Sequence, residues 1–305
     1  MSIASFFSRP GASGFGASST AEQVTDGLSL AGKRYLLTGA NSGIGLETGR
    51  VLALRGATVV CAARTVDKAA EAARGFATEI IPVACELSEP ASVRACIEHV
   101  RGLAITLDGI IANAGIMALP TLEVKHGLEL QFLTNHVGHF ILVTGLLDRL
   151  APDGRVTMLS SAAHMNTPRG GIDFDNLDGA KGYSAWSAYG RSKLANLLFA
   201  KALARRFGGS RRVANAVHPG VIATNLGRHM PSWGRAVLGA MEPLFLKSIP
   251  EGAATQTWAA VHPAAGEHNG EYLADCNVAR ASAHGRDTAL ATRLWEETEA
   301  LVARM

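Results

Sequence analysis

The chain has 305 residues, of which 48% are hydrophobic and 18% charged, with a formal net charge of +3. This composition provides for a sizeable core and excludes wholesale disorder. The basic residues are spread along the chain, so nucleic-acid binding is not indicated. No apolar run reaches the about 18 residues that a transmembrane helix needs, so no such segment is expected.

The four cysteines form no Cys-x-x-Cys pair and several lie in apolar runs. They are therefore expected to be reduced core thiols of a protein in a reducing compartment, and a cytoplasmic location is predicted. No metal site is expected, because the histidines show no ligand spacing with cysteine. Residues 1–30 are predicted to be a tail with a short helix at 19–25, although their Ser/Gly/Ala-rich composition leaves an organellar targeting segment open.

Short apolar, β-branched runs alternate with Ala- and Leu-rich helical stretches along residues 31–305. The runs predict strands at 35–38, 58–62, 79–84, 109–112, 155–159, 213–217 and 271–273. The stretches between and after them predict helices at 45–55, 66–75, 90–100, 127–150, 184–207, 252–261 and 288–302. Strict alternation predicts the α/β class, as a single Rossmann-type doubly wound domain with a seven-stranded parallel sheet and helices on both faces.

A glycine-rich turn follows the first predicted strand and leads into the first predicted helix. Such a turn lets the backbone approach a pyrophosphate, which then meets the amino end of the helix. The alternative is an ordinary turn between a strand and a helix. The residues expected to cradle a dinucleotide here are Gly39, Asn41, Ser42, Gly43, Ile44 and Gly45.

The second predicted strand ends in Ala63 and Arg64 rather than in an acid. An NAD-selective site normally carries Asp or Glu at this place, whereas a guanidinium can bind a 2′-phosphate. The sequence therefore favours NADP(H), although Arg64 could also be a solvated strand-end residue. Glu86 and Leu87 after the third strand are expected near the adenine, and Asn113, Ala114 and Gly115 after the fourth strand are expected to pack near the cofactor.

Tyr189 and Lys193 lie four residues apart on a predicted helix, so their Cβ atoms are expected about 5–6 Å apart on one face. An ammonium group favours the phenolate, and moving a Tyr pKa from about 10 toward 7 needs about 4 kcal/mol. Such a tyrosine suits the transfer of a proton to or from an alcohol oxygen. The Tyr189–Lys193 pair alone is weak evidence for this chemistry. It becomes strong evidence because the glycine turn and Ser160-Ser161 precede it in this order along the chain.

Together these motifs resemble the short-chain dehydrogenase/reductase family over about residues 30–305. The resemblance implies that Tyr189 exchanges the alcohol proton, that Ser161 positions the carbonyl oxygen and that Lys193 lowers the tyrosine pKa and binds the nicotinamide ribose. It also implies that Asn135 supports a proton relay. The residues implied to hold the nicotinamide carboxamide are Pro219, Gly220, Val221 and Thr224.

The 28-residue spacing from Ser161 to Tyr189 marks an insert at 162–185. Together with the motifs around Asn135 and Lys193, this insert resembles the retinol-dehydrogenase and WW-domain oxidoreductase branch. The N-terminal residues 14–25 are similar to those of the chloroplast translocon-associated dehydrogenases and their bacterial relatives. Glu86 departs from the family pattern, which usually has Asp there.

Residues 226–250 are apolar and interrupted by Gly and Pro, which suggests a lid over a hydrophobic pocket. A permanently packed helical pair, or a patch that faces a membrane or a partner, is the alternative. The predicted function is an NADP(H)-dependent interconversion of a hydrophobic alcohol with its ketone or aldehyde. An NADPH-binding regulatory or scaffold protein with little turnover, or a double-bond reductase, remains open. The resemblance also implies a homodimer or tetramer that pairs through the long helices at 127–150 and 184–207.

Overall fold

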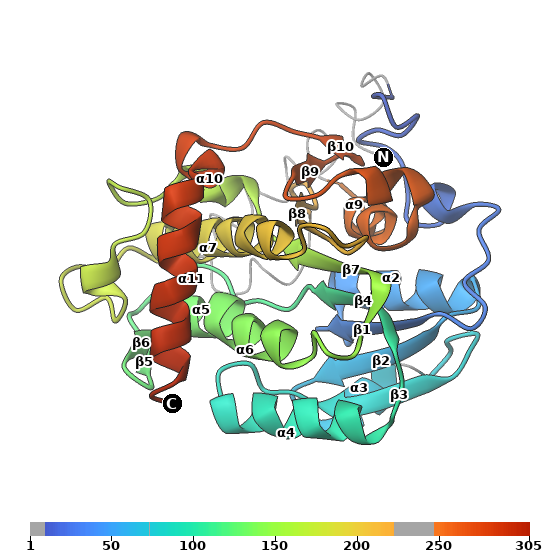
Figure 1. Cartoon of the computed structure of the whole chain (residues 1–305), viewed down its shortest axis with the longest axis horizontal. Helices are drawn as coiled ribbons and strands as arrows, with labels where there is room; N and C mark the ends of the chain where they lie inside the picture. The colour runs from blue at the N-terminus through green and yellow to red at the C-terminus, as the bar shows by residue number, and fades with distance from the viewer. Residues whose placement is uncertain (1–9, 73, 223–246) are drawn as a thin grey trace.

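The computed structural model describes residues 10–72, 74–222 and 247–305. Within these ranges one sheet has eight strands in the order β10-β9-β8-β7-β4-β1-β2-β3, shown in Figure 1. Neighbouring strands are parallel except for β9 and β10. The strand bounds are β1 Arg34–Thr38, β2 Thr58–Ala63, β3 Ile80–Ala84, β4 Leu107–Ala112, β7 Leu150–Leu159, β8 Val213–His218, β9 Tyr272–Ala274 and β10 Asn277–Val278.

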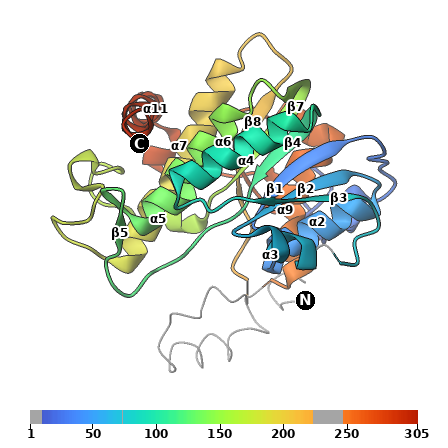
Figure 2. The same ribbon diagram turned by 90° about the horizontal axis from the view of Figure 1, so that it is seen from below.

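Helices cover both faces of the sheet, as Figure 2 shows. One face carries α2 (Gly43–Leu54), α3 (Val66–Ala72) and α9 (Ile249–Val261). The other carries α4 (Pro90–Gly102), α6 (Gly138–Gly145) and α7 (Ala185–Arg206), and α11 (Thr288–Val302) packs across α7. This is the predicted doubly wound α/β arrangement. No helix among the described residues is long and apolar enough to cross a membrane.

The seven predicted parallel strands are present, but the sheet has an eighth, antiparallel edge strand, β10. The turn between β9 and β10 has positive φ at Asp275 (51°) and at Cys276 (59°). Two positive φ angles are typical of the tight hairpin turns that Asn-Gly or Asp-Gly usually form. Since Asp-Cys lacks that signature and β10 has two residues, the sequence pattern did not reveal this hairpin. The same holds for a separate two-stranded sheet of β5 (Val124–Lys125) and β6 (Leu128–Glu129).

The single helix predicted over 127–150 is wrong at both ends and in its middle. Its first residues belong to β6, and Leu150 already pairs with Leu107 as part of β7. Between them lie α5 (Leu130–Phe132), a π-helical turn η2 (Leu133–Val137) and α6. A π-turn inserts one residue into the helical repeat, so the apolar pattern continues while the side chains rotate.

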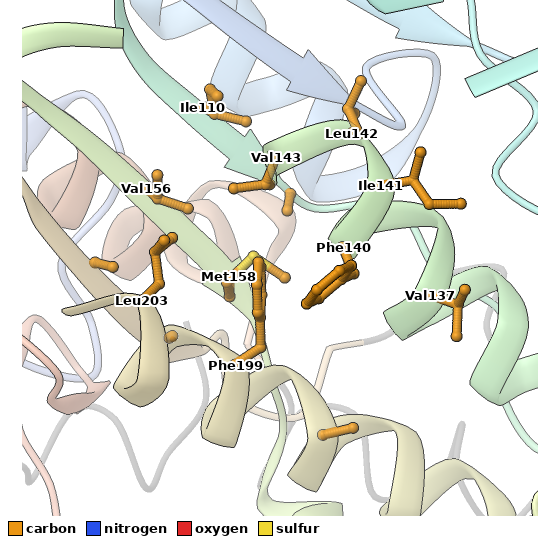
Figure 3. Packing of buried hydrophobic residues seen from close by; sticks show 14 of the residues in the cluster. Ile110, Val137, Phe140, Ile141, Leu142, Val143, Val156, Met158, Phe199 and Leu203 are labelled. Atoms are coloured by element: carbon orange, nitrogen blue, oxygen red, sulfur yellow. The ribbon is translucent and has the colours of Figure 1, made fainter. Parts of the chain in front are cut away.

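The main core lies between the sheet and the face formed by α6 and α7. Figure 3 shows Phe140 of α6, Phe199 of α7 and Met158 of β7 close to one another. The Phe140 and Phe199 ring centroids are 5.2 Å apart, and both rings also contact Trp295 of α11. The C-terminal helix is thus built into the core that supports α6 and α7. The four cysteines are buried and free, as predicted.

The N-terminal segment follows the surface of the sheet domain rather than leaving it. A short 3₁₀ turn, η1 (Gln23–Thr25), lies at the end of the segment predicted to be helical. Val24 packs beside Trp258 of α9, and the Ala21 N–H donates to the Pro250 carbonyl at 2.9 Å. Further along, the Ser13 N–H donates to the Asn277 side chain of β10 at 3.0 Å. Residues 13–25 therefore brace α9 and the sheet edge.

The insert at 162–185 is held against α7 by a buried charge. The Arg191 guanidinium donates to the Asn176 carbonyl at 2.5 Å and lies 3.6 Å from the Glu129 carboxylate. Glu129 in turn accepts from the backbone N–H groups of Gln131 and Phe132, which caps α5. The contacts of Arg191 and Glu129 link the insert, α5 and the start of α7.

Gly190 allows α7 to approach the 3₁₀ turn η3 (Ala162–Met165) without a gap. A Cβ atom at Gly190 would lie 2.2 Å from the Asn166 carbonyl oxygen and 2.6 Å from that of Ala163. Both contacts are with backbone, so the helix and the turn would have to separate. The absence of a side chain at 190 therefore determines how closely Ser161 and Tyr189 approach each other.

We predict that Gly190→Ala lowers the free energy of unfolding by about 1–3 kcal/mol, the usual cost of overpacking. Urea denaturation would measure it. Gly102→Ala is the matched control, since its Cβ would meet nothing within 4 Å at the end of α4. There we expect a change below about 1 kcal/mol. Equal, small changes in the two variants would contradict the close approach.

Candidate functional site

The predicted site residues lie after the carboxyl ends of the parallel strands. Strand order reverses between β1 and β4, since the chain goes from β1 outward to β3 and then returns to the other side of β1. Ligands of open α/β sheets bind in the crevice at this switch point. The glycine turn follows β1 and the Asn113–Gly115 segment follows β4. Ser161 follows β7, and Pro219 follows β8.

The glycine turn has the geometry of a cradle for a phosphate group. Gly39 and Gly43 have φ of 69° and 56°, in the left-handed region that favours glycine. A Cβ on Gly45 would lie 2.2 Å from the Gly39 carbonyl oxygen, so only glycine fits where α2 begins. Asn41 and Ser42 are exposed at the tip of the turn. An open turn followed by the N–H groups of a helix amino end suits an anionic pyrophosphate.

Asn113 ties the glycine turn to the end of β4. Its side-chain amide donates to the Thr38 carbonyl at 2.8 Å, and its backbone N–H donates to the Thr38 hydroxyl at 3.0 Å. The Ala114 N–H donates to the same hydroxyl at 3.0 Å. The structure thus brings the two predicted cofactor segments together through Thr38, which the sequence reasoning did not single out.

The residues predicted to bind the adenosine end of the cofactor lie in different surroundings. Arg64 is exposed directly after β2, and it forms no ion pair with any residue that the structure describes. The Glu86 carboxylate instead accepts from the Ser88 N–H and hydroxyl at 3.2 and 3.0 Å, within its own turn. Leu87 is buried against α6, where a Cβ on Gly138 would lie 2.3 Å from the Leu87 carbonyl oxygen. Contacts of Glu86 and Leu87 with adenine remain predictions.

Ser161 and Tyr189 meet across the contact that Gly190 allows. The Ser161 hydroxyl oxygen accepts from the Ala163 N–H at 3.1 Å, which orients it at the start of η3. Tyr189 is 8% exposed, and burial raises the pKa of its phenol to about 12, while a hydrogen bond with Ser161 acts in the lowering direction. Tyr189 is therefore a protonated donor at neutral pH.

Lys193 lies one helical turn further, with its ammonium nitrogen 5.6 Å from the centre of the Tyr189 ring. Burial lowers the pKa of Lys193 to about 8, so the group remains mostly charged at pH 7. The ammonium donates to the Leu159 carbonyl at 3.1 Å, which leaves two of its three donors for other partners. Burial is the main cause of the raised Tyr189 pKa, and Lys193 is not among the groups that lower it here.

Asn135 lies in the π-turn and holds the chain that follows Gly115. Its side chain accepts from the Ile116 N–H at 2.8 Å and donates to the Ile116 carbonyl at 2.9 Å. It also donates to the Ser192 hydroxyl at 2.9 Å. A Cβ on Gly115 would lie 3.0 Å from the Asn135 side-chain oxygen and 3.3 Å from the Lys193 nitrogen. Gly115, Asn135 and Lys193 therefore meet as the sequence pattern suggested.

The loop after β8 is held at its base. Gly220 has φ of 90°, and a Cβ there would lie 2.6 Å from the side chain of Lys247, which pairs with Asp275 at 2.6 Å. Val221 is exposed, and its carbonyl accepts from the Lys247 N–H at 2.8 Å. Thr224 and residues 226–246 of the predicted lid lie outside the described residues.

Two buried histidines lie near the site. His139 contacts the Thr38 hydroxyl and the Asn135 carbonyl, and no spacing rule signalled it. His164 is fully buried, with one ring nitrogen 2.7 Å from the Ser161 carbonyl oxygen and the other accepting from the Ser282 N–H at 3.0 Å. Among the residues that the structure describes, no three His, Cys, Asp or Glu side chains gather as a metal site.

Sequence comparison connects this chain to a known family. The family model described as short chain dehydrogenase matches residues 33–173. The chain is 42% identical over 309 residues to "Short-chain dehydrogenase TIC 32 A, chloroplastic" of Brassica napus, which covers 96% of each protein. It is 38% identical over 278 residues to retinol dehydrogenase 12 of Mus musculus, which covers 89% of this chain and 86% of that protein. Both branches anticipated from the motifs are confirmed.

Solved structures agree with this relationship. A putative uncharacterized protein from Mycobacterium paratuberculosis superposes with a TM-score of 0.76 at 34% identity, covering 92% of this chain and 97% of that one. The angucycline C-6 ketoreductase LanV with bound NADP gives a TM-score of 0.66 at 25% identity, covering 81% and 95%. Since sequence and fold agree, this chain belongs to the short-chain dehydrogenases.

Proposed function

We propose that this oxidoreductase uses NADP(H) to interconvert a hydrophobic alcohol and its ketone or aldehyde. The observation that carries the proposal is the convergence of Ser161, Tyr189 and Lys193 beside Gly115, at the edge where the glycine turn opens. A proton donor, an orienting hydroxyl and a cation are thereby placed next to a cradle that fits a dinucleotide. A ketoreductase with bound NADP among the similar structures supports the same chemistry.

In the direction of reduction, a bound NADPH would supply the hydride for the new C–H bond. The Ser161 and Tyr189 hydroxyls donate to the carbonyl oxygen as negative charge develops on it, and Tyr189 then transfers its proton to that oxygen. The Lys193 ammonium stabilises the phenolate that remains until solvent returns a proton. The high pKa of Tyr189 suits this direction, because the phenol is fully protonated at neutral pH. Oxidation runs through the same groups in reverse.

Exposed apolar side chains beside the catalytic residues support a hydrophobic substrate. Trp186 lies one turn before Tyr189 on α7, with the ring centroids 6.3 Å apart and nearly perpendicular, and its side chain is 45% exposed. Met165 at the end of η3 is 60% exposed, and Val221 is exposed after Gly220. Large apolar side chains at a binding site are the usual partners of an apolar ligand. We propose that Trp186 and Met165 contact the substituents of the carbonyl.

The predicted homodimer or tetramer would pair through the long helices, but α11 of the same subunit already covers part of α7. α11 packs on α7, where the Arg206 guanidinium lies 3.6 Å above the Trp295 ring and Phe199 stacks on the same tryptophan. We propose that any homodimer or tetramer uses another surface than this part of α7. The cytoplasmic location is kept as a proposal beside the chloroplastic one that the name of a relative suggests.

We predict that Tyr189→Phe lowers kcat for carbonyl reduction by about 10²- to 10⁴-fold, because the proton donor is lost. The affinity for NADPH should stay within a few-fold. NADPH oxidation would be followed with a panel of aromatic, steroid and aliphatic ketones and aldehydes. Tyr183→Phe is the matched control, since the Tyr183 hydroxyl donates to the Leu119 carbonyl in the insert contact. Tight NADPH binding by the wild type without turnover on any carbonyl would instead favour a regulatory NADPH-binding protein.

Arg64→Ala should raise KM for NADPH by about 10- to 100-fold, since charge-assisted bonds to a 2′-phosphate contribute about 1.5–3 kcal/mol. KM for NADH should remain unchanged, because NADH has no such phosphate. Arg101→Ala, which removes an exposed cation on α4, is the control. An equal effect of Arg64→Ala on both cofactors would mean that Arg64 does not read the 2′-phosphate.

Trp186→Ala should raise KM for bulky apolar ketones by about 5- to 30-fold, as expected for losing about 1–2 kcal/mol of apolar contact. KM for a small aliphatic aldehyde should change little. The control is Leu54→Ala at the far end of α2, because Leu54 is also 45% exposed. An unchanged KM of the Trp186→Ala variant for every bulky ketone would contradict the proposed contact between Trp186 and the substrate.

A further inference from the structure

His139 joins the cofactor cradle to the turn that carries Asn135. It lies in α6, four residues after Asn135, and its side chain is fully buried. One ring nitrogen, Nε2, lies 2.9 Å from the Thr38 hydroxyl, and the other, Nδ1, lies 2.8 Å from the Asn135 carbonyl oxygen. The imidazole is thus the contact between the end of β1 and the π-turn.

The hydrogen-bond donors and acceptors around the His139 ring determine which of its nitrogens carries the proton. The Thr38 hydroxyl already accepts the N–H groups of Asn113 and Ala114, each at 3.0 Å. A hydroxyl has two acceptor sites and one proton, so its proton is left for His139 Nε2. Nε2 therefore accepts, and the ring proton is on Nδ1, where it donates to the Asn135 carbonyl. The opposite tautomer would place two hydrogens between His139 and Thr38.

Charged imidazole does not fit this arrangement either. Protonation would put an N–H at Nε2 against an oxygen whose two acceptor sites are occupied. Burial lowers the pKa of His139 to about 4, and the positive charge of Lys193 acts in the same direction. A neutral ring with one defined tautomer therefore persists at physiological pH.

The bonds beyond His139 extend to groups of the proposed reaction. On one side, Thr38 fixes Asn113 and Ala114, next to the glycine turn. On the other side, the Asn135 side chain bonds to both the backbone N–H and the carbonyl of Ile116, beside Gly115 and Lys193. A shift of the π-turn relative to β1 would therefore move the Lys193 surroundings away from the cofactor cradle.

We propose that His139 is a positioning residue, whose neutral Nδ1–H imidazole locks the glycine turn and the Asn113–Gly115 segment to the π-turn of Asn135. The inference rests on the proposed oxidoreductase function for its kinetic consequence. Its structural part, the tautomer and the effect on cofactor affinity, is independent of turnover.

The direct test is nitrogen NMR of the full chain with ¹⁵N-labelled histidine, without cofactor at pH 7. His139 is assigned by the signals lost in His139→Gln. We expect a protonated Nδ1 and an unprotonated Nε2. An Nε2–H tautomer or an imidazolium at position 139 would overturn the proposal.

The second test compares His139→Phe with His136→Phe, a matched change of a buried histidine in the adjoining π-turn. His136 bonds instead to the Thr298 hydroxyl of α11 at 3.0 Å. Melting temperature, NADPH affinity by fluorescence and kcat would be measured for each. We expect His139→Phe to weaken NADPH binding and lower kcat by tenfold or more. His136→Phe should lower the melting temperature and leave kcat within twofold.

His139→Gln is the conservative variant, because its amide offers one donor and one acceptor and should recover most of the loss. It also replaces the Phe variant if the latter does not fold. Unchanged NADPH affinity and kcat in His139→Phe, or parallel losses in His136→Phe, would contradict a positioning role. If the wild type binds NADPH and reduces no carbonyl, the proposed function fails. The tautomer of His139 and the NADPH affinity of its variants would then still test whether His139 is a positioning residue.

Discussion

The site depends on how α7 is fastened to the end of β7. The Ser160 hydroxyl donates to the Lys193 carbonyl at 2.8 Å, and the Lys193 ammonium and Asn196 amide donate to the Leu159 carbonyl at 3.1 and 3.0 Å. These three bonds cross between a strand end and a helix; the first is buried and the other two are partly buried. Because Tyr189 lies on the same helix and Ser161 follows the same strand, the fastening places the proposed proton donor beside the proposed orienting hydroxyl. Gly190 supplies the space for this approach, and Arg191 holds the insert around it.

Burial sets the protonation states around this contact. The pKa of Tyr189 is raised and that of Lys193 is lowered, both because the charged forms lose solvation. The tyrosine therefore begins as a phenol, ready to protonate an oxygen, and the lysine remains close to its titration range. Bringing a cationic nicotinamide near Tyr189 would favour the phenolate that alcohol oxidation needs. Preference for one direction then follows from which form of the cofactor occupies the cradle.

The sequence predicted those parts of the fold and site in which one local pattern decides the structure. Apolar runs located the seven parallel strands. The glycines located the turn, because Gly39 and Gly43 have left-handed φ and a Cβ on Gly45 would clash with backbone. Tyr189 and Lys193 follow from helical spacing. Other parts depend on distant partners. The π-turn around Asn135 keeps the apolar pattern of a plain helix, and the Asp275-Cys276 hairpin lacks the usual turn residues. The Glu86 carboxylate accepts hydrogen bonds from Ser88 within its own turn. His139 contacts Thr38 only because the fold brings α6 to the end of β1.

The central claim is that this site transfers a hydride to a carbonyl carbon with Tyr189 as the acid. Its most direct test uses NADPH deuterated at the transferring position of the nicotinamide, with the carbonyl substrate that turns over fastest. The product would be analysed by NMR for deuterium. The account predicts one deuterium on the carbinol carbon with the wild type, and formation of this product about 10²- to 10⁴-fold more slowly with Tyr189→Phe. Saturated binding of NADPH with no deuterated alcohol, or deuterium at a former C=C carbon, would contradict it.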